Sequence, residues 1–413
     1  MASGGDGRST PPAPGGRAEV VTVYAVGLFQ GLSLVAFPAA ATLLTSASGY
    51  DLSKSRYGIL FLPQVVMAIV GSLGLPTFSR RFTLKRVLLA GVLADTLAMA
   101  LLVGSVAVEH DAGAYAMLLV ATASLGLGFG LTLGSISTYA GAFMPDRRDV
   151  ALTALNVLLG LGTALSPFLI ALFTDVAQWW YLPLIAAAGL AVLFVVVLVQ
   201  PMDIPTGERQ AAKARIPALF VLFAGGLVIY GVCETMFGNW GTTLLTGHGV
   251  KATSAQDALA VFWGAVTLGR LAIALVAGRI RTTRIYVVLP WAVAGALLLA
   301  PLAKGAGAGI GVFALAGFAC SGFFPMTIGY GESTFPNIVE LAAGWLIAAY
   351  QVGYGLAAFG GGALQNVVSL STVFRLTAGL AVVMAIVAVP IARCQRPARA
   401  PAPAPVRAAV PAS

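Results

Sequence analysis

Charged residues are scarce in this chain. Only 9% of its 413 residues are charged, whereas 59% are hydrophobic. A soluble domain typically carries about 25% charged and 45–50% apolar residues, so the composition excludes a soluble globular enzyme. It also excludes a disordered chain, which requires low hydrophobicity and high charge. The composition therefore predicts a protein embedded in a membrane.

Cysteine and histidine are also rare. The three cysteines and two histidines form no CxxC pair and no His/Cys/acid cluster, so we expect neither a disulfide framework nor a metal site. The chain contains no GxxxxGK[ST] loop, which excludes a P-loop ATP-driven pump. It also contains no Ser/His/Asp constellation of an embedded protease or transferase. We therefore expect a protein that is not an enzyme and that needs no cofactor.

Long apolar runs are the dominant feature of the sequence. A bilayer core of about 30 Å takes roughly 20 apolar residues in a helix. The runs are continuous and do not alternate, which favours helices over a barrel. The pattern predicts an all-α membrane protein with twelve transmembrane helices, at 20–46, 57–78, 87–107, 114–142, 151–174, 178–200, 216–246, 255–278, 285–303, 308–333, 341–365 and 373–393.

A polar segment at 201–215 divides these spans six and six. Thr42–Thr45 (TLLT) recurs as Thr243–Thr246 in the second set, which indicates an internal repeat. Two parallel six-helix halves are the plan of major facilitator transporters. We expect a disordered cytoplasmic tail at 1–19, halves at 20–200 and 216–393, a cytoplasmic linker at 201–215 and a second disordered cytoplasmic tail at 394–413.

The basic residues orient the chain. Most of the 24 Lys and Arg residues fall on one side if both termini are cytoplasmic, as the positive-inside rule requires. This placement explains the net charge of +9 without a nucleic-acid partner. We expect a multi-pass monomer in the lipid bilayer of the cytoplasmic (inner) membrane, with both termini cytoplasmic.

Three segments resemble a known superfamily. The loop from Gly71 to Arg86 is similar to the GxLxDRxGRR loop of the major facilitator superfamily, although its acidic residue is absent. The segments 230–240 (YGVCETMFGNW) and 258–270 (ALAVFWGAVTLGR) resemble the fucose–proton symporter branch, which includes sugar permeases. The resemblance implies a small-molecule substrate and protons as the coupling ion.

Basic loops occupy equivalent places in the two halves, and we expect them to act in gating at one face. Their residues are Arg80, Arg81, Lys85, Arg86, Arg279, Arg281 and Arg284.

Three charged residues lie deep inside predicted spans, where each costs about 2.5–3.5 kcal/mol to insert. Glu234 and Arg270 lie about 18 and 22 Å from the same membrane surface at 1.5 Å per residue, so an ion pair between them is geometrically possible. We expect this pair to couple protons, with a purely structural bridge as the alternative. Asp95 is a weaker coupling candidate; the alternative is that it snorkels or pairs with the Arg80–Arg86 loop.

Several polar and aromatic residues are candidates for substrate binding. An indole face can stack on a sugar ring and an amide can bond its hydroxyls, and such pockets need few polar groups on an apolar wall. Ordinary packing is the alternative for each tryptophan. The candidates are Asn239, Trp240, Trp263, Gln351, Gln64 and Asn156.

These observations predict a secondary active transporter that moves a small polar solute, such as a sugar, by alternating access and proton symport. One alternative is a proton-coupled efflux antiporter of hydrophobic compounds. Such antiporters often carry a GPxxGG-like run in span five, and its absence from Gly162–Pro167 favours import. A further alternative is a non-transporting membrane sensor or scaffold, against which the lack of a soluble domain argues.

Overall fold

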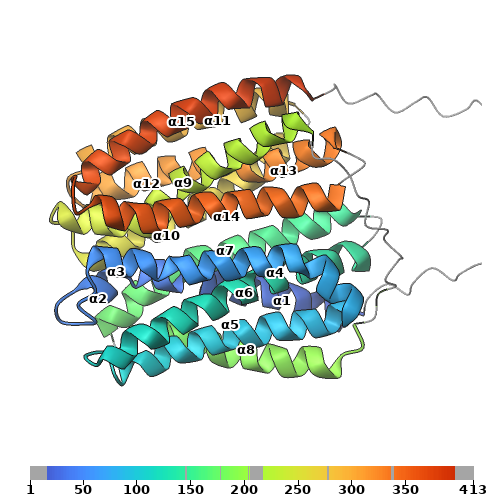
Figure 1. Cartoon of the computed structure of the whole chain (residues 1–413), viewed down its shortest axis with the longest axis horizontal. Coiled ribbons are helices and arrows are strands. Elements are labelled where there is room, and N and C mark those ends of the chain that lie inside the picture. Colours follow the sequence, from blue (N-terminus) through green and yellow to red (C-terminus); the bar gives the residue numbers. More distant parts are fainter. Residues whose placement is uncertain are drawn as a thin grey trace, which may run out of the picture.

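The computed structural model describes residues 16–144, 147–176, 178–202, 204, 217–276, 279–335 and 339–395, and these residues form a helical bundle (Figure 1). The first half contains α1 (Arg17–Ala39), α2 (Ala41–Thr45), α3 (Lys54–Ile59), α4 (Phe61–Arg81), α5 (Leu84–Val106), α6 (Ala112–Phe143), α7 (Arg148–Val176) and α8 (Tyr181–Val199). The second contains α9 (Ala218–Gly247), α10 (Ala252–Val276), α11 (Thr282–Leu299), η2 (Ala300–Leu302), α12 (Ala306–Cys320), α13 (Phe323–Thr334), α14 (Val339–Leu364) and α15 (Leu370–Arg393).

These helices make up twelve spans, as the sequence predicts. In the described part of the chain, 11 helical segments are long and apolar enough to cross a membrane. Four of them combine two helical elements each: α1 with α2, α3 with α4, α11 with η2, and α12 with α13. The 26-residue helix α14 supplies the remaining span.

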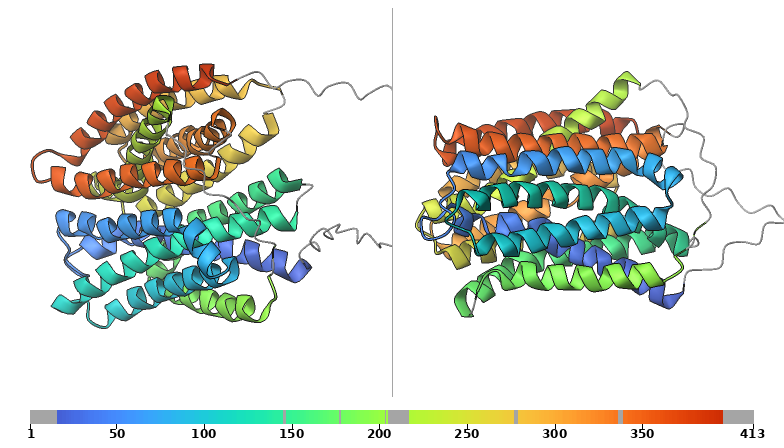
Figure 2. Two further views of the ribbon diagram at one scale, coloured as in Figure 1. Left: turned by 45° about the vertical axis from the view of Figure 1, so that its right-hand side comes forward. Right: turned by 60° about the horizontal axis from the view of Figure 1, so that its bottom comes forward.

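The spans form two bundles of six that lie side by side (Figures 1 and 2). Both ends of the described chain, the end of α8 and the start of α9 lie at one end of the molecule, which we call the terminal face. The other end is the opposite face. Most of the 201–215 linker and of the tails at 1–19 and 394–413 lies outside the described residues, so the domain limits stay predictions.

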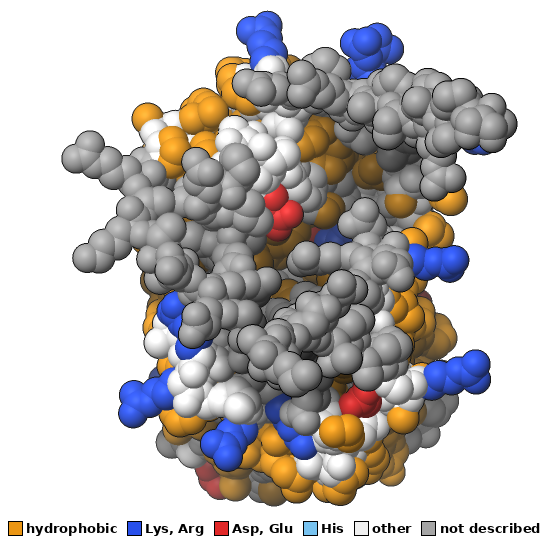
Figure 3. Space-filling view, turned by 90° about the vertical axis from the view of Figure 1, so that its right-hand side faces the viewer, with side chains coloured by type: hydrophobic (Ala, Val, Ile, Leu, Met, Phe, Trp, Pro, Cys, Tyr) orange, Lys and Arg blue, Asp and Glu red, His pale blue; other side chains and the backbone are white. Residues whose placement is uncertain are grey.

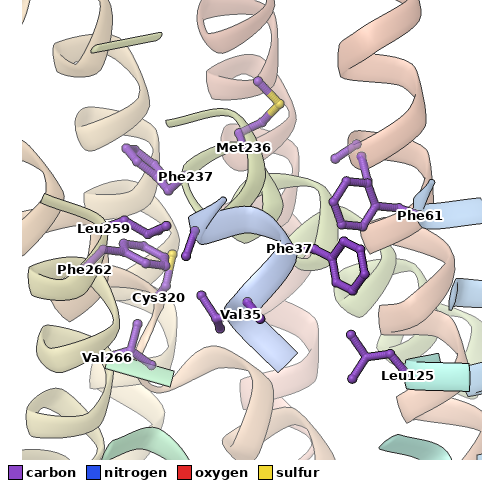
Figure 4. Packing of buried hydrophobic residues seen from close by; sticks show 14 of the residues in the cluster. Val35, Phe37, Phe61, Leu125, Met236, Phe237, Leu259, Phe262, Val266 and Cys320 are labelled. Atoms are coloured by element: carbon purple, nitrogen blue, oxygen red, sulfur yellow. The ribbon is translucent and has the colours of Figure 1, made fainter. Parts of the chain in front are cut away.

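Packing between the halves is centred on two helix pairs. Helix α7 packs on α10, and α4 packs on α14. Side chains of α1 fill the space between the bundles. Figure 4 shows them between a residue of α4 on one side and residues of α9 and α10 on the other: Val35, Phe37, Phe61, Phe237 and Phe262.

The halves are closed against each other at the opposite face. Asn366 Nδ2 donates a hydrogen bond of 2.9 Å to Ser55 Oγ across the interface, and the Tyr57 and Trp240 rings meet edge to face with centroids 5.3 Å apart. By contrast, the terminal face is hollowed near its middle and carries basic side chains around its edge (Figure 3). The structure is therefore closed at the opposite face and hollowed at the terminal face.

The loop that precedes α3 at the opposite face is fixed by Tyr50. Its hydroxyl lies 2.7 Å from Ser105 Oγ, and its ring meets Trp179 edge-on. Burial raises the pKa of Tyr50 to about 12. The hydroxyl stays neutral at physiological pH, so this anchor does not respond to pH.

The basic loops at the terminal face do not hold the two halves together in this conformation. Lys85 Nζ donates a hydrogen bond of 3.0 Å to the Leu198 carbonyl, which belongs to its own half. Arg81 stacks over the neighbouring Phe82 ring. Within the described ranges, no hydrogen bond or ion pair from the seven predicted gating residues crosses between the halves. Their role in gating stays a prediction for a state in which this face is closed.

Candidate functional site

Glu234 lies in the middle of α9 with only 4% of its surface exposed. The Tyr350 hydroxyl, from α14, donates a hydrogen bond of 2.6 Å to Glu234 Oε2. The Tyr230 hydroxyl, one turn earlier on α9, lies 2.6 Å from Glu234 Oε1. Both oxygens of the buried carboxyl group thus have neutral tyrosine partners. Among the described residues, it has no cation within ion-pair distance.

The tenth span is broken beside this carboxyl group, where the sequence predicted one helix over 308–333. Helix α12 ends at Cys320 and α13 begins at Phe323. Pro325 explains the break because it has no N–H to bond the carbonyl of Ser321, four residues earlier. Gly322 in the intervening turn adds local freedom. Pro325 thereby frees the Ser321 carbonyl, and the Cys320 carbonyl lies at the end of α12, where the regular helical pattern stops.

Side chains from α9 and α10 bind these two carbonyls. The Tyr230 hydroxyl lies 2.7 Å from the Cys320 carbonyl oxygen, and Arg270 Nε donates a hydrogen bond of 3.4 Å to the Ser321 carbonyl. In transporters, unwound backbone in the membrane occurs where it lines a cavity or an ion site. The break is therefore the point at which Glu234, through Tyr230, and Arg270 converge.

Arg270 does not form the ion pair with Glu234 that its depth allowed. No pair within 4 Å joins them, although Arg270 is near enough to act on Glu234 electrostatically. Its one hydrogen bond uses one of five N–H donors. Its positive charge is favourable at the C-terminal end of α12, where the helix dipole is negative. The remaining donors are free to bind oxygen atoms of a solute.

Asp95 neither snorkels nor pairs with the Arg80–Arg86 loop, so that expectation was wrong. It is fully buried and accepts hydrogen bonds from Gln30 Nε2 (3.3 Å) and Thr132 Oγ1 (3.1 Å). A Cβ atom on Gly128 would lie 2.1 Å from Asp95 Oδ1, so the glycine makes room for the carboxyl group. Local amide and hydroxyl donors hold Asp95 inside the first bundle, which explains why it stays away from the basic loop.

A cluster of polar side chains links the two halves near the middle of the bundle. Asn239 Nδ2 donates a hydrogen bond of 3.3 Å to the Tyr354 hydroxyl, and the Gln64 amide interacts with the same hydroxyl from α4. Gln64 Oε1 is buried without a hydrogen-bond partner. Gln351 lies on α14, is buried and has no side-chain hydrogen bond to any described residue. These candidates gather around Tyr354, at the contact between α4, α9 and α14.

The two tryptophans among the candidates differ. Trp263 packs on Gly238 of α9, and its buried indole N–H has no hydrogen-bond partner among the described residues. Trp240 is fully buried, and its indole N–H donates a hydrogen bond of 3.0 Å to the Ala357 carbonyl. Trp263 can therefore donate to a solute, whereas Trp240 packs in the closed opposite face.

Asn156 is not brought to the polar group around Tyr354. It is exposed on α7, and its amide donates to the Leu152 carbonyl of its own helix.

Sequence reasoning missed the tyrosines. Tyr230 precedes Glu234 by four residues, and Tyr350 precedes Tyr354 by four, so each pair lies on one helix face. This spacing was a readable signal on α9. The sequence alone does not show that α14 packs on α9, nor which side chains of other helices bind Asp95. Among the described residues, no group of three or more His, Cys, Asp or Glu side chains is placed to hold a metal ion.

Comparisons with known proteins place this arrangement in a family. The family model of the Major Facilitator Superfamily matches residues 23–337. The fold is similar to that of a mutant form of the nucleoside transporter NupG, at 15% identity and a TM-score of 0.73 over 90% of this chain and 99% of that chain. It is also similar to that of a D-xylose-proton symporter, at 14% identity and a TM-score of 0.73 over 92% and 99% of the two chains.

No curated protein matches the chain. The family match covers most of the sequence, and both structural relatives share the complete fold. The chain therefore belongs to the Major Facilitator Superfamily and is a membrane transporter, not an enzyme.

Proposed function

We propose that this transporter imports a small polar solute, of the sugar type, together with protons, and that Glu234 carries the coupling proton. The observation that carries the proposal is the environment of Glu234. A carboxyl group buried in an apolar span is costly unless it is functional, and a permanent cationic partner would hold it ionised. Glu234 has two neutral tyrosine partners and, among the described residues, no ion pair, so it is free to gain and lose a proton.

Polar groups at the break and around Tyr354 suit a solute rich in oxygen atoms. Arg270 keeps unused N–H donors, the Trp263 N–H has no partner, and Gln64 Oε1 has none. A pocket of this kind needs only a few placed polar groups on an apolar wall. We assign Arg270, Trp263, Gln64, Gln351 and Asn239 to solute binding. The fold shared with a D-xylose-proton symporter supports a sugar-type solute.

We further propose that the protein lies in the cytoplasmic membrane with its terminal face inside the cell. The basic side chains around that face fit the positive-inside rule (Figure 3). The hollow at this face then corresponds to a state open to the cytoplasm. In this state the opposite face is closed by the contacts of Ser55, Tyr57 and Trp240.

Solute-induced proton movement tests the proposal. Purified protein in weakly buffered liposomes is mixed with pentoses and hexoses while an internal pH dye is recorded. Symport predicts that protons enter together with the solute and that a proton ionophore abolishes the signal. Proton exit on addition of a hydrophobic compound instead supports the efflux antiporter. Failure of counterflow for every solute class supports the sensor or scaffold.

A further inference from the structure

The Tyr230 hydroxyl has two short oxygen contacts but only one hydrogen, and this difference indicates the protonation state of Glu234. The Tyr230 oxygen lies 2.6 Å from Glu234 Oε1 and 2.7 Å from the Cys320 carbonyl oxygen. A phenol has one hydrogen to donate, and a backbone carbonyl can only accept. Two contacts this short each need a hydrogen between the oxygens. Tyr230 must therefore donate to Cys320, and the second hydrogen must come from Glu234.

The contact between the Tyr350 hydroxyl and Glu234 Oε2 agrees with a proton on Glu234 Oε1. With the proton on Oε1, Glu234 donates to Tyr230, Tyr230 donates to the Cys320 carbonyl, and Tyr350 donates to Oε2. Every hydrogen bond is then satisfied. With an ionised Glu234, Tyr230 can serve only one of its two neighbours, and either the carboxylate or the Cys320 carbonyl loses its donor in a buried site. An unpaired buried group of this kind is costly.

We propose that Glu234 is protonated in this conformation and that Tyr230 is a positioning residue, which transmits the proton on Glu234 to the break between α12 and α13. The inference rests on the proposed function, because Glu234 is taken there as the proton carrier. When the Oε1–H bond breaks, the proton passes to solvent water. The carboxylate then draws the Tyr230 hydroxyl hydrogen to Oε1, and the Cys320 carbonyl is released.

Release of the Cys320 carbonyl affects the break between α12 and α13 because Cys320 lies at its edge. Cys320 is the last residue of α12, and its carbonyl has no regular helical partner across the turn at Ser321 and Gly322. In the described residues, Tyr230 is the side chain that ties this carbonyl to α9, while Arg270 ties the next one to α10. Loss of the Tyr230 bond leaves the backbone of the break held to neighbouring helices by the Arg270 contact and by packing. Deprotonation therefore loosens the break.

The titratable and charged groups that face Glu234 come from several helices: Tyr230 from α9, Tyr350 and Tyr354 from α14, Cys320 from α12 and Arg270 from α10. Arg270 is the one permanent charge among them. The others stay neutral at physiological pH because phenols and thiols ordinarily ionise above it. A pH response of the break within the physiological range therefore reports Glu234.

The experiment uses the purified full-length protein in nanodiscs, without any solute. Infrared difference spectra of wild type against Glu234→Gln are recorded at mildly acidic and at alkaline pH. We expect the C=O band of a protonated carboxyl group at acidic pH, a loss of that band in Glu234→Gln, and a shift of its frequency in Tyr230→Phe. Absence of a wild-type band at acidic pH would overturn the proposal.

Amide hydrogen exchange over residues 318–326 then tests the link to the break, with each variant compared with wild type at the same pH. At alkaline pH, where Glu234 is ionised, wild type should exchange roughly fivefold faster than Glu234→Gln, which is the change that one ordinary hydrogen bond makes in an opening equilibrium. At acidic pH the two proteins should exchange at the same rate. Tyr230→Phe should exchange fast at both pH values, and Glu234→Gln slowly at both, since its amide N–H still donates to Tyr230. Tyr350→Phe removes the partner of Glu234 Oε2 but leaves the Tyr230–Cys320 contact, so it should keep a pH response with a shifted midpoint.

Two results separate this inference from the proposed function. If Tyr230→Phe keeps the wild-type pH response, Tyr230 does not transmit the protonation of Glu234 to the break, whatever happens to proton-driven uptake. If wild type shows the carboxyl band and the exchange response but moves no protons with any solute, the proposed function fails and the link stands.

Discussion

Glu234 and Arg270 reach the same break in the tenth span without forming an ion pair. Arg270 binds the Ser321 carbonyl directly, whereas Glu234 reaches the Cys320 carbonyl through Tyr230. A direct pair would fix both charges, and removal of either partner would strand the other in low dielectric. The observed arrangement leaves the carboxyl group free to change its protonation and the guanidinium free to bind a solute.

Arg270→Lys should therefore preserve folding while weakening solute binding. Lysine keeps the positive charge but lacks the forked geometry that binds two oxygens at once. We expect solute affinity to fall roughly tenfold or more, with a melting temperature close to wild type. Isothermal titration with the transported solute and a thermal melt measure the two effects. Arg375→Lys, at an exposed position on α15, is the matched control; unfolding of Arg270→Lys alone would show a structural bridge.

Gly128→Ala should destabilise the first half. The added Cβ atom would lie 2.1 Å from Asp95 Oδ1, so the buried carboxyl group and its bonds to Gln30 and Thr132 must shift. Overpacking of this kind typically costs about 1–3 kcal/mol. The melting temperature of the purified protein should fall.

Gly379→Ala is the control for this change, because a Cβ atom there meets nothing within 4 Å. It should leave stability unchanged or slightly raised, since alanine is the better helix former. Equal melting temperatures for the two variants would show that Asp95 is not held as described.

Cys394 provides a native reporter of topology. It is exposed at the terminal face, whereas Cys233 and Cys320 are buried. If that face is cytoplasmic, an impermeant thiol reagent added to intact cells should leave Cys394 unlabelled and should label it after permeabilisation. Lys251→Cys in a Cys394→Ser background lies at the opposite face and should label in intact cells. The reverse pattern would invert the proposed orientation.

Arg86 and Arg284 occupy equivalent loops at the terminal face, and among the described residues neither forms a hydrogen bond or ion pair with the other half in this conformation. If they hold the face closed in another state, Arg86→Gln with Arg284→Gln should slow turnover while solute affinity stays within about twofold. Initial rates of counterflow and equilibrium binding give the two quantities. Unchanged turnover at equal expression would remove these loops from gating.

Much of the fold could be predicted from the sequence because membrane insertion imposes a simple rule. Twenty apolar residues per span give the number of helices, whereas the orientation inferred from the bias of Lys and Arg stays a prediction. The break at Ser321–Gly322 was overlooked, although Pro325 signals it. The depth of Glu234 and Arg270 could be read at 1.5 Å per residue, but rotation about each helix axis could not. Rotation decides that Glu234 faces Tyr350 and that Arg270 faces Ser321, so the ion pair that the depths allowed is absent.

The measurement that tests the central claim most directly compares uphill uptake with exchange in Glu234→Gln. Glutamine keeps a neutral group that can still donate to Tyr230, so folding and solute binding should survive, while no proton can be carried. In liposomes with a pH gradient, we predict that accumulation of labelled solute falls to the level set by diffusion, whereas exchange of labelled for unlabelled solute continues. Full proton-driven accumulation by Glu234→Gln would contradict the account and would direct attention to Asp95.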